Sequence, residues 1–364
     1  MFELPEPEPQ VQRPRKRRRA GGLVLGLLSV AIVGSLVAVG VVSVSGLLGD
    51  VADRLTDEQY EDYAGATGPE VEVTIEAGDG GEQVAQKLVD ADVVASFEAI
   101  IRPMRLTNPI IYPGTYSFPT KMSGAAALAL LVSGENRVIL EVTLREGLRL
   151  DQIFARLSEA LEIPVSELEA AVANLELPAG APNAEAMLFP ATYKFDPGVS
   201  ADLVINTLHN RLLQELDSFG LSLAEDYDVL ITASLIQAEA SIEEDFYKVS
   251  RVIQNRLDSD MLLQFDSTVN YGTKGTTVTT SDEQRADDNP YNTYRYKGLP
   301  VGAIGSPGSL AIDAALNPVD GDWIYFVTVN LKTGETVFNR DYSDHLAAVE
   351  VFLEFLRENP EYND

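Results

Sequence analysis

Residues 233–245 read ASLIQAEASIEED, and they place one carboxylate, Glu239, within a run of apolar and small side chains. In a helix, Leu235, Ile236 and Ile242 share the face of Glu239, because residues three and four apart lie on the same side. We therefore predict a helix over residues 227–240 that carries Glu239 near its end. Burial among apolar groups disfavours the charged carboxylate and raises its pKa, which is how a glutamate becomes a general acid near neutral pH.

The acidic residues that follow Glu239 have a structural explanation. Ser241 and Glu244 have the spacing of a capping box, and residues 243–245 complement the N-terminus of a following helix. A solitary glutamate on an apolar helix face can also be half exposed or salt-bridged. The residues alone therefore leave open whether Glu239 is catalytic.

Strands and helices alternate irregularly on both sides of this helix. Alternating or aromatic-rich patterns predict strands at residues 71–76, 112–118, 137–147, 188–195, 322–330 and 335–341. Apolar spacing of three and four predicts helices at residues 123–135, 148–161, 164–175, 200–216, 249–257, 310–318 and 344–359. Residues 262–308 are predicted to be loops. The order has no strand–helix–strand rhythm, so the predicted class is α+β.

The N-terminal part has the pattern of a membrane anchor. Residues 20–49 carry no charge, and a basic cluster at residues 13–19 precedes them. About 20 apolar residues span a bilayer, and basic residues remain on the cytoplasmic side. We predict a cytoplasmic tail at 1–19, a single transmembrane helix at 20–49 and an acidic stalk at 50–69. A cleaved signal peptide is the alternative, although its apolar core is shorter, about 7–15 residues.

Composition excludes several function classes. The chain has 56 acidic and 27 basic residues and a net charge of −29, which disfavours binding to nucleic acid. It has no cysteine and only two histidines, His209 and His345, so we expect neither a metal site nor a cofactor. Catalysis would then depend mainly on aspartate, glutamate, tyrosine, serine, lysine or arginine side chains.

Several longer segments resemble the endolytic murein transglycosylases of the MltG (YceG-like) type. They occur in a consistent order over about residues 70–350: VTIEAGDGGEQVAQKLVDADVV at 73–94, EAMLFPATYKF at 185–195, ASLIQAEAS at 233–241, LQFDSTVNYG at 263–272, YNTYRYKGLPVGAIGSPGSLAIDAALNP at 291–318 and TVFNRDYSDHLAAV at 336–349. The first of these resembles the LysM-like region of the family. The resemblance therefore implies a LysM-like α+β module at 70–136 and an α+β catalytic domain at 137–364, with a helical subdomain at about 148–225.

The resemblance implies a lytic transglycosylase in which Glu239 is the catalytic residue. In this family the glutamate protonates the oxygen of the β-1,4 bond between N-acetylmuramic acid and N-acetylglucosamine. It then deprotonates the C6 hydroxyl of the muramic residue, which closes a 1,6-anhydro ring and ends a nascent strand. One carboxyl group suffices, unlike the two used by most glycosidases.

The resemblance also implies residues that bind the substrate. These are Gln264, Asp266, Thr268, Tyr271, Asn292, Tyr294, Glu185 and Tyr193. Two alternatives stay open, because Asp266 could stabilise a turn and Asn292 could cap one. His345 matches a family histidine, for which packing or capping is the favoured role.

Four residues differ from the usual family pattern. Gln237 stands where a second glutamate is common, Ala186 where glycine is usual, Ala191 where an acid is usual and Ser306 where asparagine is usual. None removes the expected acid, but Gln237 and Ala191 reduce the number of acidic groups and put the fine positioning of the substrate in doubt.

The expected partners are peptidoglycan strands and the cytoplasmic membrane, with the catalytic domain outside the cytoplasm. Two non-catalytic alternatives stay open. The chain could be a peptidoglycan-binding protein that uses its LysM-like module, or a scaffold for cell-wall synthesis with penicillin-binding synthases as partners.

Overall fold

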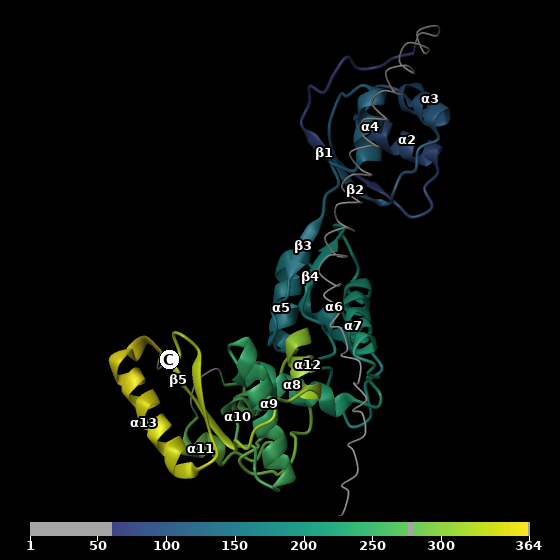
Figure 1. Ribbon diagram of the computed structural model, residues 1–364. Coiled ribbons are helices and arrows are strands. Elements are labelled where there is room, and N and C mark those ends of the chain that lie inside the picture. Colours follow the sequence, from purple (N-terminus) through teal and green to yellow (C-terminus); the bar gives the residue numbers. More distant parts are fainter. Residues whose placement is uncertain (1–59, 276–279, 363–364) are drawn as a thin grey trace, which may run out of the picture. The chain divides into compact units, whose positions relative to one another are not determined.

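The computed structural model describes residues 60–275 and 280–362, which form a mixed α+β structure (Figure 1). The chain divides into two compact units, Met1–Val138 and Ile139–Asp364. We call their described parts unit 1 and unit 2, and each is treated by itself.

Unit 1 is a two-stranded sheet covered by helices. Strand β1 (Glu70–Ile75) pairs antiparallel with β2 (Gly114–Pro119), and Val73 lies opposite Tyr116. Helices α2 (Gly81–Asp90) and α3 (Phe97–Thr107) connect the strands, and α4 (Gly124–Ser133) follows them. The alternation of β1 buries Val73 and Ile75 against the apolar faces of these helices. Unit 1 therefore has a hydrophobic core of its own.

Helix α4 approaches α3 very closely at Gly124. A Cβ atom at this position would lie 1.9 Å from the backbone oxygen of Ala99 and 2.4 Å from its carbonyl carbon. Only glycine fits such a contact between backbones. At its other end, α4 stops at Gly134, whose φ of 67° is left-handed, as the sequence predicts for a glycine after a helix.

The first part of unit 2 surrounds the short sheet of β3 (Leu140–Thr143) and β4 (Thr192–Phe195). Helices α5 (Leu150–Leu161), α6 (Val165–Val172) and α7 (Ala201–Ser218) cover it and share a core with it. Ser200 caps α7 through its side chain, which accepts a hydrogen bond from the N–H of Leu203. Both strands are shorter than the predicted strands at 137–147 and 188–195, because only residues 140–143 and 192–195 pair.

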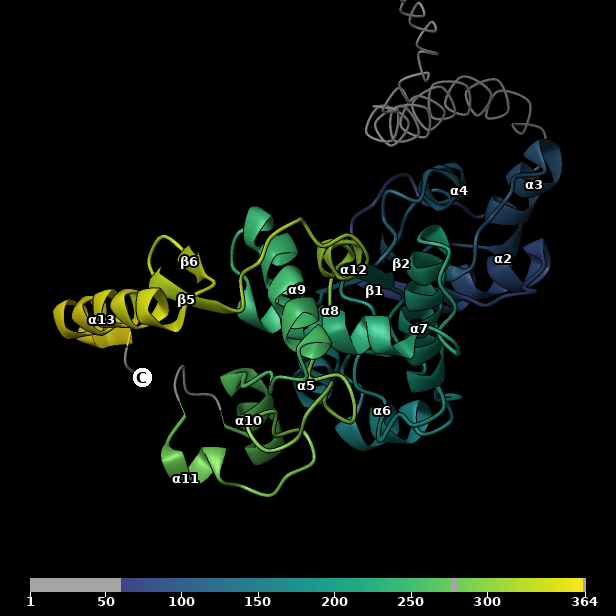
Figure 2. The same ribbon diagram turned by 60° about the horizontal axis from the view of Figure 1, so that its bottom comes forward.

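A second core in unit 2 surrounds helix α8 (Tyr227–Glu239). Helices α9 (Glu243–Asp258) and α12 (Ser309–Leu316) pack against it, and Figure 2 shows the three together. The observed bounds of α8 confirm the helix predicted over 227–240. The predicted capping box is wrong, because α9 begins after Ile242 without a side-chain cap. Glu243, Glu244 and Asp245 do lie in its first turn, as expected.

The rest of unit 2 contains two short helices and a C-terminal module. Helices α10 (Asp266–Thr273) and α11 (Asp282–Arg285) lie in the segment that was predicted to be loops. Strands β5 (Tyr325–Asn330) and β6 (Glu335–Asn339) form a hairpin, on which α13 (Tyr342–Glu358) packs before the short 3-10 helix η1 (Pro360–Tyr362). Helix α13 lies alongside this hairpin in Figure 2.

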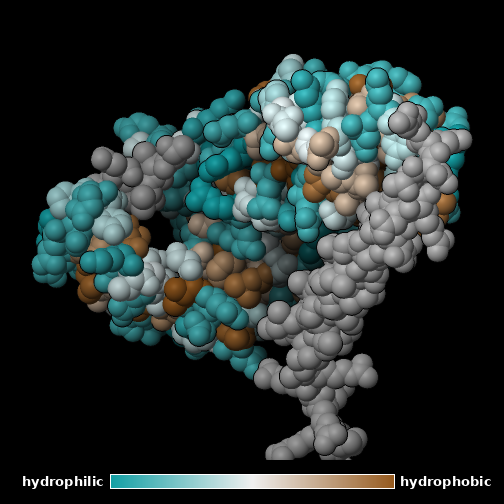
Figure 3. Space-filling view, turned by 90° about the horizontal axis from the view of Figure 1, so that it is seen from above, coloured by the Kyte–Doolittle hydropathy of each residue, from teal (hydrophilic) through white to brown (hydrophobic). Residues whose placement is uncertain are grey.

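The predicted fold class needs one correction, which concerns the transmembrane helix. Residues 20–49 lie outside the described residues, and within 60–275 and 280–362 no helix is both long enough and apolar enough to cross a membrane. Helix α7, with 18 residues, contains Asp202, Arg211 and Glu215, whereas a membrane span needs about 20 mostly apolar residues. The fold class that the structure supports is mixed α+β. Figure 3 shows hydrophilic residues interspersed with apolar ones on the visible face.

Candidate active site

Glu239 is the last residue of α8, and its side chain is half-buried. The helix before it is apolar on almost every side, with Leu230, Leu235 and Ile236 fully buried against α9 and α12. It ends where Ala240 adopts an extended backbone, with φ of −103° and ψ of 140°. A rigid helix therefore carries this carboxyl group to the point where the chain leaves the core.

The carboxyl group of Glu239 is bonded to α10 and has an unusual pKa. The hydroxyl of Ser267 donates a hydrogen bond to Oε1 of Glu239 at 2.5 Å. Although the residue keeps some accessible surface, burial of its carboxyl group raises its pKa to about 7, and the nearby Asp266 carboxylate acts in the same direction. Ser267 and the Arg256 guanidinium lower it. Glu239 can therefore both hold and release a proton near neutral pH.

Asp266 and Tyr294 lie together beside Glu239. The Tyr294 phenol donates to Oδ1 of Asp266 at 2.7 Å, and the Thr280 hydroxyl donates to the same oxygen at 2.6 Å. Arg285 places its Nε 3.5 Å from that oxygen. Burial and the Asp266 carboxylate raise the pKa of Tyr294, and the charge of Glu239 also contributes. Asp266 thus joins three segments of the chain, which is more than the stabilisation of a local turn.

Thr268 and Asn292 lie inside the protein and brace the same region. The Thr268 hydroxyl donates to the backbone oxygen of Phe265 at 2.6 Å and lies 2.9 Å from the hydroxyl of Thr293. The amide of Asn292 donates to two backbone oxygens, and its Oδ1 accepts from the N–H of Tyr294 at 3.0 Å. Both side chains are fully buried. The structure therefore does not bring their polar groups to the surface beside Glu239.

The other predicted binding residues lie in different surroundings. Gln264 is exposed, with a left-handed φ of 50°. Tyr193 is buried in β4, where its hydroxyl donates to the oxygen of Phe189 at 2.6 Å and burial raises its pKa to about 12. Glu185 and Tyr271 form a pair, in which the phenol donates to Oε2 of the carboxyl at 2.9 Å. The structure thus groups Asp266 and Tyr294 with Glu239, and Glu185 with Tyr271.

Three of the four departures from the family pattern can also be placed. Oε1 of Gln237 accepts a hydrogen bond from the N–H of Gly308 at 3.0 Å, so this side chain fixes the start of α12. Ser306 is buried, and its backbone exchanges hydrogen bonds with the loop at Gly147 and Leu148. Ala186 has a φ of 65°, the left-handed conformation for which glycine is best suited.

Sequence reasoning missed Ser267 and Arg256. Ser267 lies between Asp266 and Thr268 in the LQFDSTVNYG segment, and Arg256 lies on α9 with its side chain buried over the rings of Phe265 and Tyr325. The sequence feature that could have pointed to Ser267 was its hydroxyl directly after Asp266, a residue already expected to bind the substrate. Within the described residues, no group of three or more histidine, aspartate or glutamate side chains is arranged to hold a metal ion.

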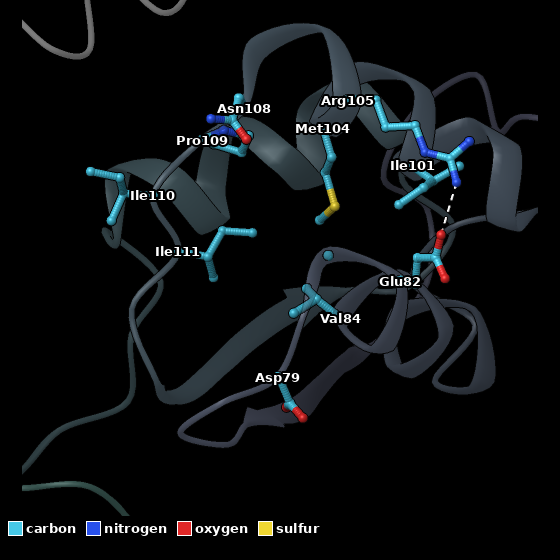
Figure 4. A pocket seen from close by; sticks show the side chains of 11 residues that line it. Asp79, Glu82, Val84, Ile101, Met104, Arg105, Asn108, Pro109, Ile110 and Ile111 are labelled. Atoms are coloured by element: carbon cyan, nitrogen blue, oxygen red, sulfur yellow. Dashed lines mark hydrogen bonds and ion pairs between the residues drawn. The ribbon is translucent and has the colours of Figure 1, made fainter.

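Unit 1 contains a pocket of about 450 Å³ between the start of α2 and the segment after α3 (Figure 4). Val84, Met104 and Ile111 lie around its middle, whereas Glu82 and Arg105 form an ion pair at one side, with 2.9 Å between Oε1 and Nη2. The pocket therefore offers an apolar floor with a polar margin, a common combination in sites for small ligands.

Comparison with known proteins gives a consistent set of relatives. A profile of the YceG-like family matches residues 73–351. The chain is similar to an endolytic murein transglycosylase of Bacillus subtilis, with 27% identity over 307 residues that cover 78% of this chain and 85% of that protein. A similar match to the endolytic murein transglycosylase of Streptococcus pneumoniae strain D39 has 28% identity over 170 residues, 44% of this chain and 31% of that protein.

A solved structure has a similar fold. It is that of a yceG-like protein of Listeria monocytogenes, with a TM-score of 0.50 and 26% identity, and the match covers 77% of this chain and 99% of that one. The family profile extends over both units and includes Glu239, Ser267 and the neighbouring Asp266. This chain belongs to the YceG-like family.

Proposed function

We propose that this protein is a peptidoglycan lytic transglycosylase in which Glu239 is both the acid and the base. The observation that carries the proposal is the carboxyl group of Glu239 at the end of α8, whose burial raises its pKa to about 7 although the residue keeps some accessible surface. Family membership supports the enzyme class, since curated relatives are named endolytic murein transglycosylases. Neither Asp266, which is bonded to three side chains, nor the buried Glu185 offers a second free carboxylate.

The proposed reaction needs only one proton carrier. Protonated Glu239 gives its proton to the oxygen that bridges C1 of N-acetylmuramic acid and C4 of N-acetylglucosamine, and the C1–O bond breaks. The carboxylate then takes the proton of the C6 hydroxyl while that oxygen forms a bond to C1. The products are a 1,6-anhydro-muramic end and a free C4 hydroxyl, so no water is consumed and Glu239 regains its proton.

We further propose that the enzyme cuts nascent strands and so limits their length. Its catalytic unit would act outside the cytoplasm at the cytoplasmic membrane, because peptidoglycan lies there. The basic residues 13–19 followed by the uncharged residues 20–49 support this localisation. An association with penicillin-binding synthases stays a prediction, which co-purification would test.

Product analysis tests the proposed reaction. Full-length protein is incubated with isolated glycan strands, and mass spectrometry identifies the new ends. Anhydro-muramic ends are expected, and Glu239→Gln should abolish them while thermal unfolding stays unchanged. Glu243→Gln is the matched control, because Glu243 is exposed in the first turn of α9. Reducing ends would indicate a hydrolase instead, and an unaffected Glu239→Gln variant would exclude Glu239 as the acid.

A glycan-binding role for unit 1 is a second proposal. Its support is the pocket lined by Val84, Met104 and Ile111 within the region that resembles a LysM-like module. The apolar floor suits the C–H faces and acetamido methyl groups of amino sugars. Such binding would hold a strand whether or not unit 2 cuts it.

Sedimentation with sacculi tests this second role. The inactive Glu239→Gln full-length protein should sediment with sacculi, and the additional change Ile111→Asp should reduce the bound fraction. Leu106→Asp serves as the control, because Leu106 is 58% exposed and does not line the pocket. Equal binding by all three proteins would contradict a glycan site in this pocket.

A further inference from the structure

We propose that Ser267 is a positioning residue that holds the carboxyl group of Glu239 for proton transfer. The inference rests on the proposed function of Glu239. Its geometrical basis is the hydrogen bond of 2.5 Å from the Ser267 hydroxyl to Oε1 of Glu239. The two residues are 28 positions apart and belong to different helices, α10 and α8.

Glu239 needs such a contact because it lies at the end of its helix. Ala240 already has an extended backbone, and the neighbouring Ala238 is exposed, so neither residue encloses the glutamate side chain. A glutamate side chain has three rotatable bonds, and proton transfer requires it in one arrangement. A hydrogen bond from another element restricts this freedom of the carboxyl group.

Ser267 supplies this contact from a fixed position. The residues on either side of the Asp266–Ser267 pair, Phe265 and Thr268, are buried. The N–H of Phe265 donates to the Thr293 hydroxyl at 3.0 Å, and the Thr268 hydroxyl is bonded on both sides. The first turn of α10 is thereby fastened to the segment at Thr293, so the Ser267 hydroxyl has little freedom to move.

The hydrogen bond between Ser267 and Glu239 can form in both protonation states of the carboxyl group. The serine hydroxyl donates to Oε1 of the carboxylate, and its oxygen can accept the proton of the neutral carboxyl group. Ser267 can in this way hold the carboxyl group in one arrangement while Glu239 releases and regains its proton.

Charged and titratable groups from three segments face Glu239 and affect its pKa. The largest effect is burial, and the hydroxyl of Ser267 opposes it. Burial favours the neutral form, and Asp266 of α10 does the same, whereas the hydroxyl of Ser267, Arg256 of α9 and the backbone N–H of Ser267 favour the charged form. Tyr294, from the segment before α12, faces the same carboxyl group. Loss of the hydroxyl should therefore raise the pKa of Glu239.

The test compares Ser267→Ala, which removes the donor, with Ser267→Thr, which retains a hydroxyl. For Ser267→Ala we expect kcat for anhydro-end formation to fall about tenfold, and the alkaline limb of its pH profile to move up by roughly one pH unit. Ser267→Thr should restore both values in part. Ser259→Ala is the matched control, because Ser259 is exposed at the end of α9. An unchanged rate and an unchanged pH profile in Ser267→Ala would overturn the proposal.

A second measurement keeps this test separate from that of the proposed function. Carbon-13 NMR of labelled glutamate side chains, with Glu239→Gln to assign the signal, follows the titration of Glu239 directly. A higher titration midpoint in Ser267→Ala supports the proposal, and an unchanged midpoint refutes it. A wild-type protein that releases no anhydro ends would refute the proposed function, whatever the titration shows. If Ser267→Ala does not fold, Ser267→Cys, a weaker donor of similar size, is titrated instead and should show a smaller shift in the same direction.

Discussion

The phenol of Tyr271 donates a hydrogen bond to Oε2 of Glu185 at 2.9 Å, while Oε1 of the same carboxyl accepts from the N–H of Leu150 at 2.9 Å. This carboxyl group therefore joins α10 to the first residue of α5. Glu185 is only 3% exposed, and burial raises its pKa to about 7 although both hydrogen bonds oppose the rise. We interpret Glu185 as an internal link that holds a proton, and not as a second catalytic acid.

The stability of the protein should depend on pH through Glu185. Its pKa is about 7 in the folded chain against 4.5 for an unperturbed glutamate, so between these values the folded state binds the additional proton. The free energy of unfolding should then fall as pH rises through this window, by up to ~3 kcal/mol. Glu185→Gln, which cannot ionise, should reduce this slope in urea titrations. Glu169→Gln, an exposed change on α6, should keep it, and an equal slope in the wild type and in Glu185→Gln would contradict the prediction.

The rate of strand cleavage should depend on pH through Glu239. An acid with a pKa of about 7 is largely protonated below that pH and largely ionised above it. Initial rates of anhydro-end formation should therefore decline above about pH 7, by up to tenfold for each further pH unit. A rate that stays constant to two units above this point would argue that another group supplies the proton.

Ala186→Gly should stabilise unit 2. Ala186 is buried with a φ of 65°, a conformation that costs an L-residue with a Cβ roughly 1–2 kcal/mol. Glycine removes this strain but loses more conformational freedom on folding, so we expect a net gain of ~0.5–1 kcal/mol. Thermal unfolding measures the change. Ala184→Gly is the control. Ala184 is also buried but does not have a positive φ, so its replacement by glycine should destabilise unit 2. A lower midpoint for Ala186→Gly would contradict the explanation.

Thr268→Val should destabilise the region that carries Ser267. Valine has nearly the same shape but leaves the backbone oxygen of Phe265 and the hydroxyl of Thr293 without this partner. Buried groups that lose a partner cost about 1–3 kcal/mol, which urea unfolding would detect. In Thr207→Val the lost hydroxyl bonds only to Leu203 one turn earlier in α7, so a change under ~0.5 kcal/mol is expected. Similar values for both variants would refute the bracing role of Thr268.

The helix that carries Glu239 could be predicted because its signals are local. The mostly apolar segment from Leu230 to Ile236 is buried except at Thr232, and the helix ends as this segment gives way to charge. The glycine at 134 ends α4 for an equally local reason. By contrast, the predicted strand at 137–147 pairs only at Leu140–Thr143, because pairing depends on where β4 is placed.

Helix α10 could not be predicted, and the contact of Ser267 with Glu239 was missed with it. The sequence DSTVNYGT contains glycine and β-branched residues, which are poor helix formers. The helix forms because Thr268 and Val269 are buried and the segment is fastened to Thr293. Such long-range contacts leave no periodic pattern in a single sequence. Asp266 and Tyr193 both matched family motifs. The motifs could not show that Asp266 lies beside Glu239 whereas Tyr193 lies within a hydrophobic core, because these positions also depend on long-range contacts.

The close approach of α4 to α3 at Gly124 offers a genetic tool. A bulky residue such as valine would press on the backbone of Ala99, which cannot move aside as a flexible side chain could. Gly124→Val should therefore disrupt unit 1 in a chain of unchanged length that still contains unit 2. Cells that carry this allele would show which phenotypes depend on unit 1, with its proposed glycan site, and which need only the proposed strand cleavage by unit 2.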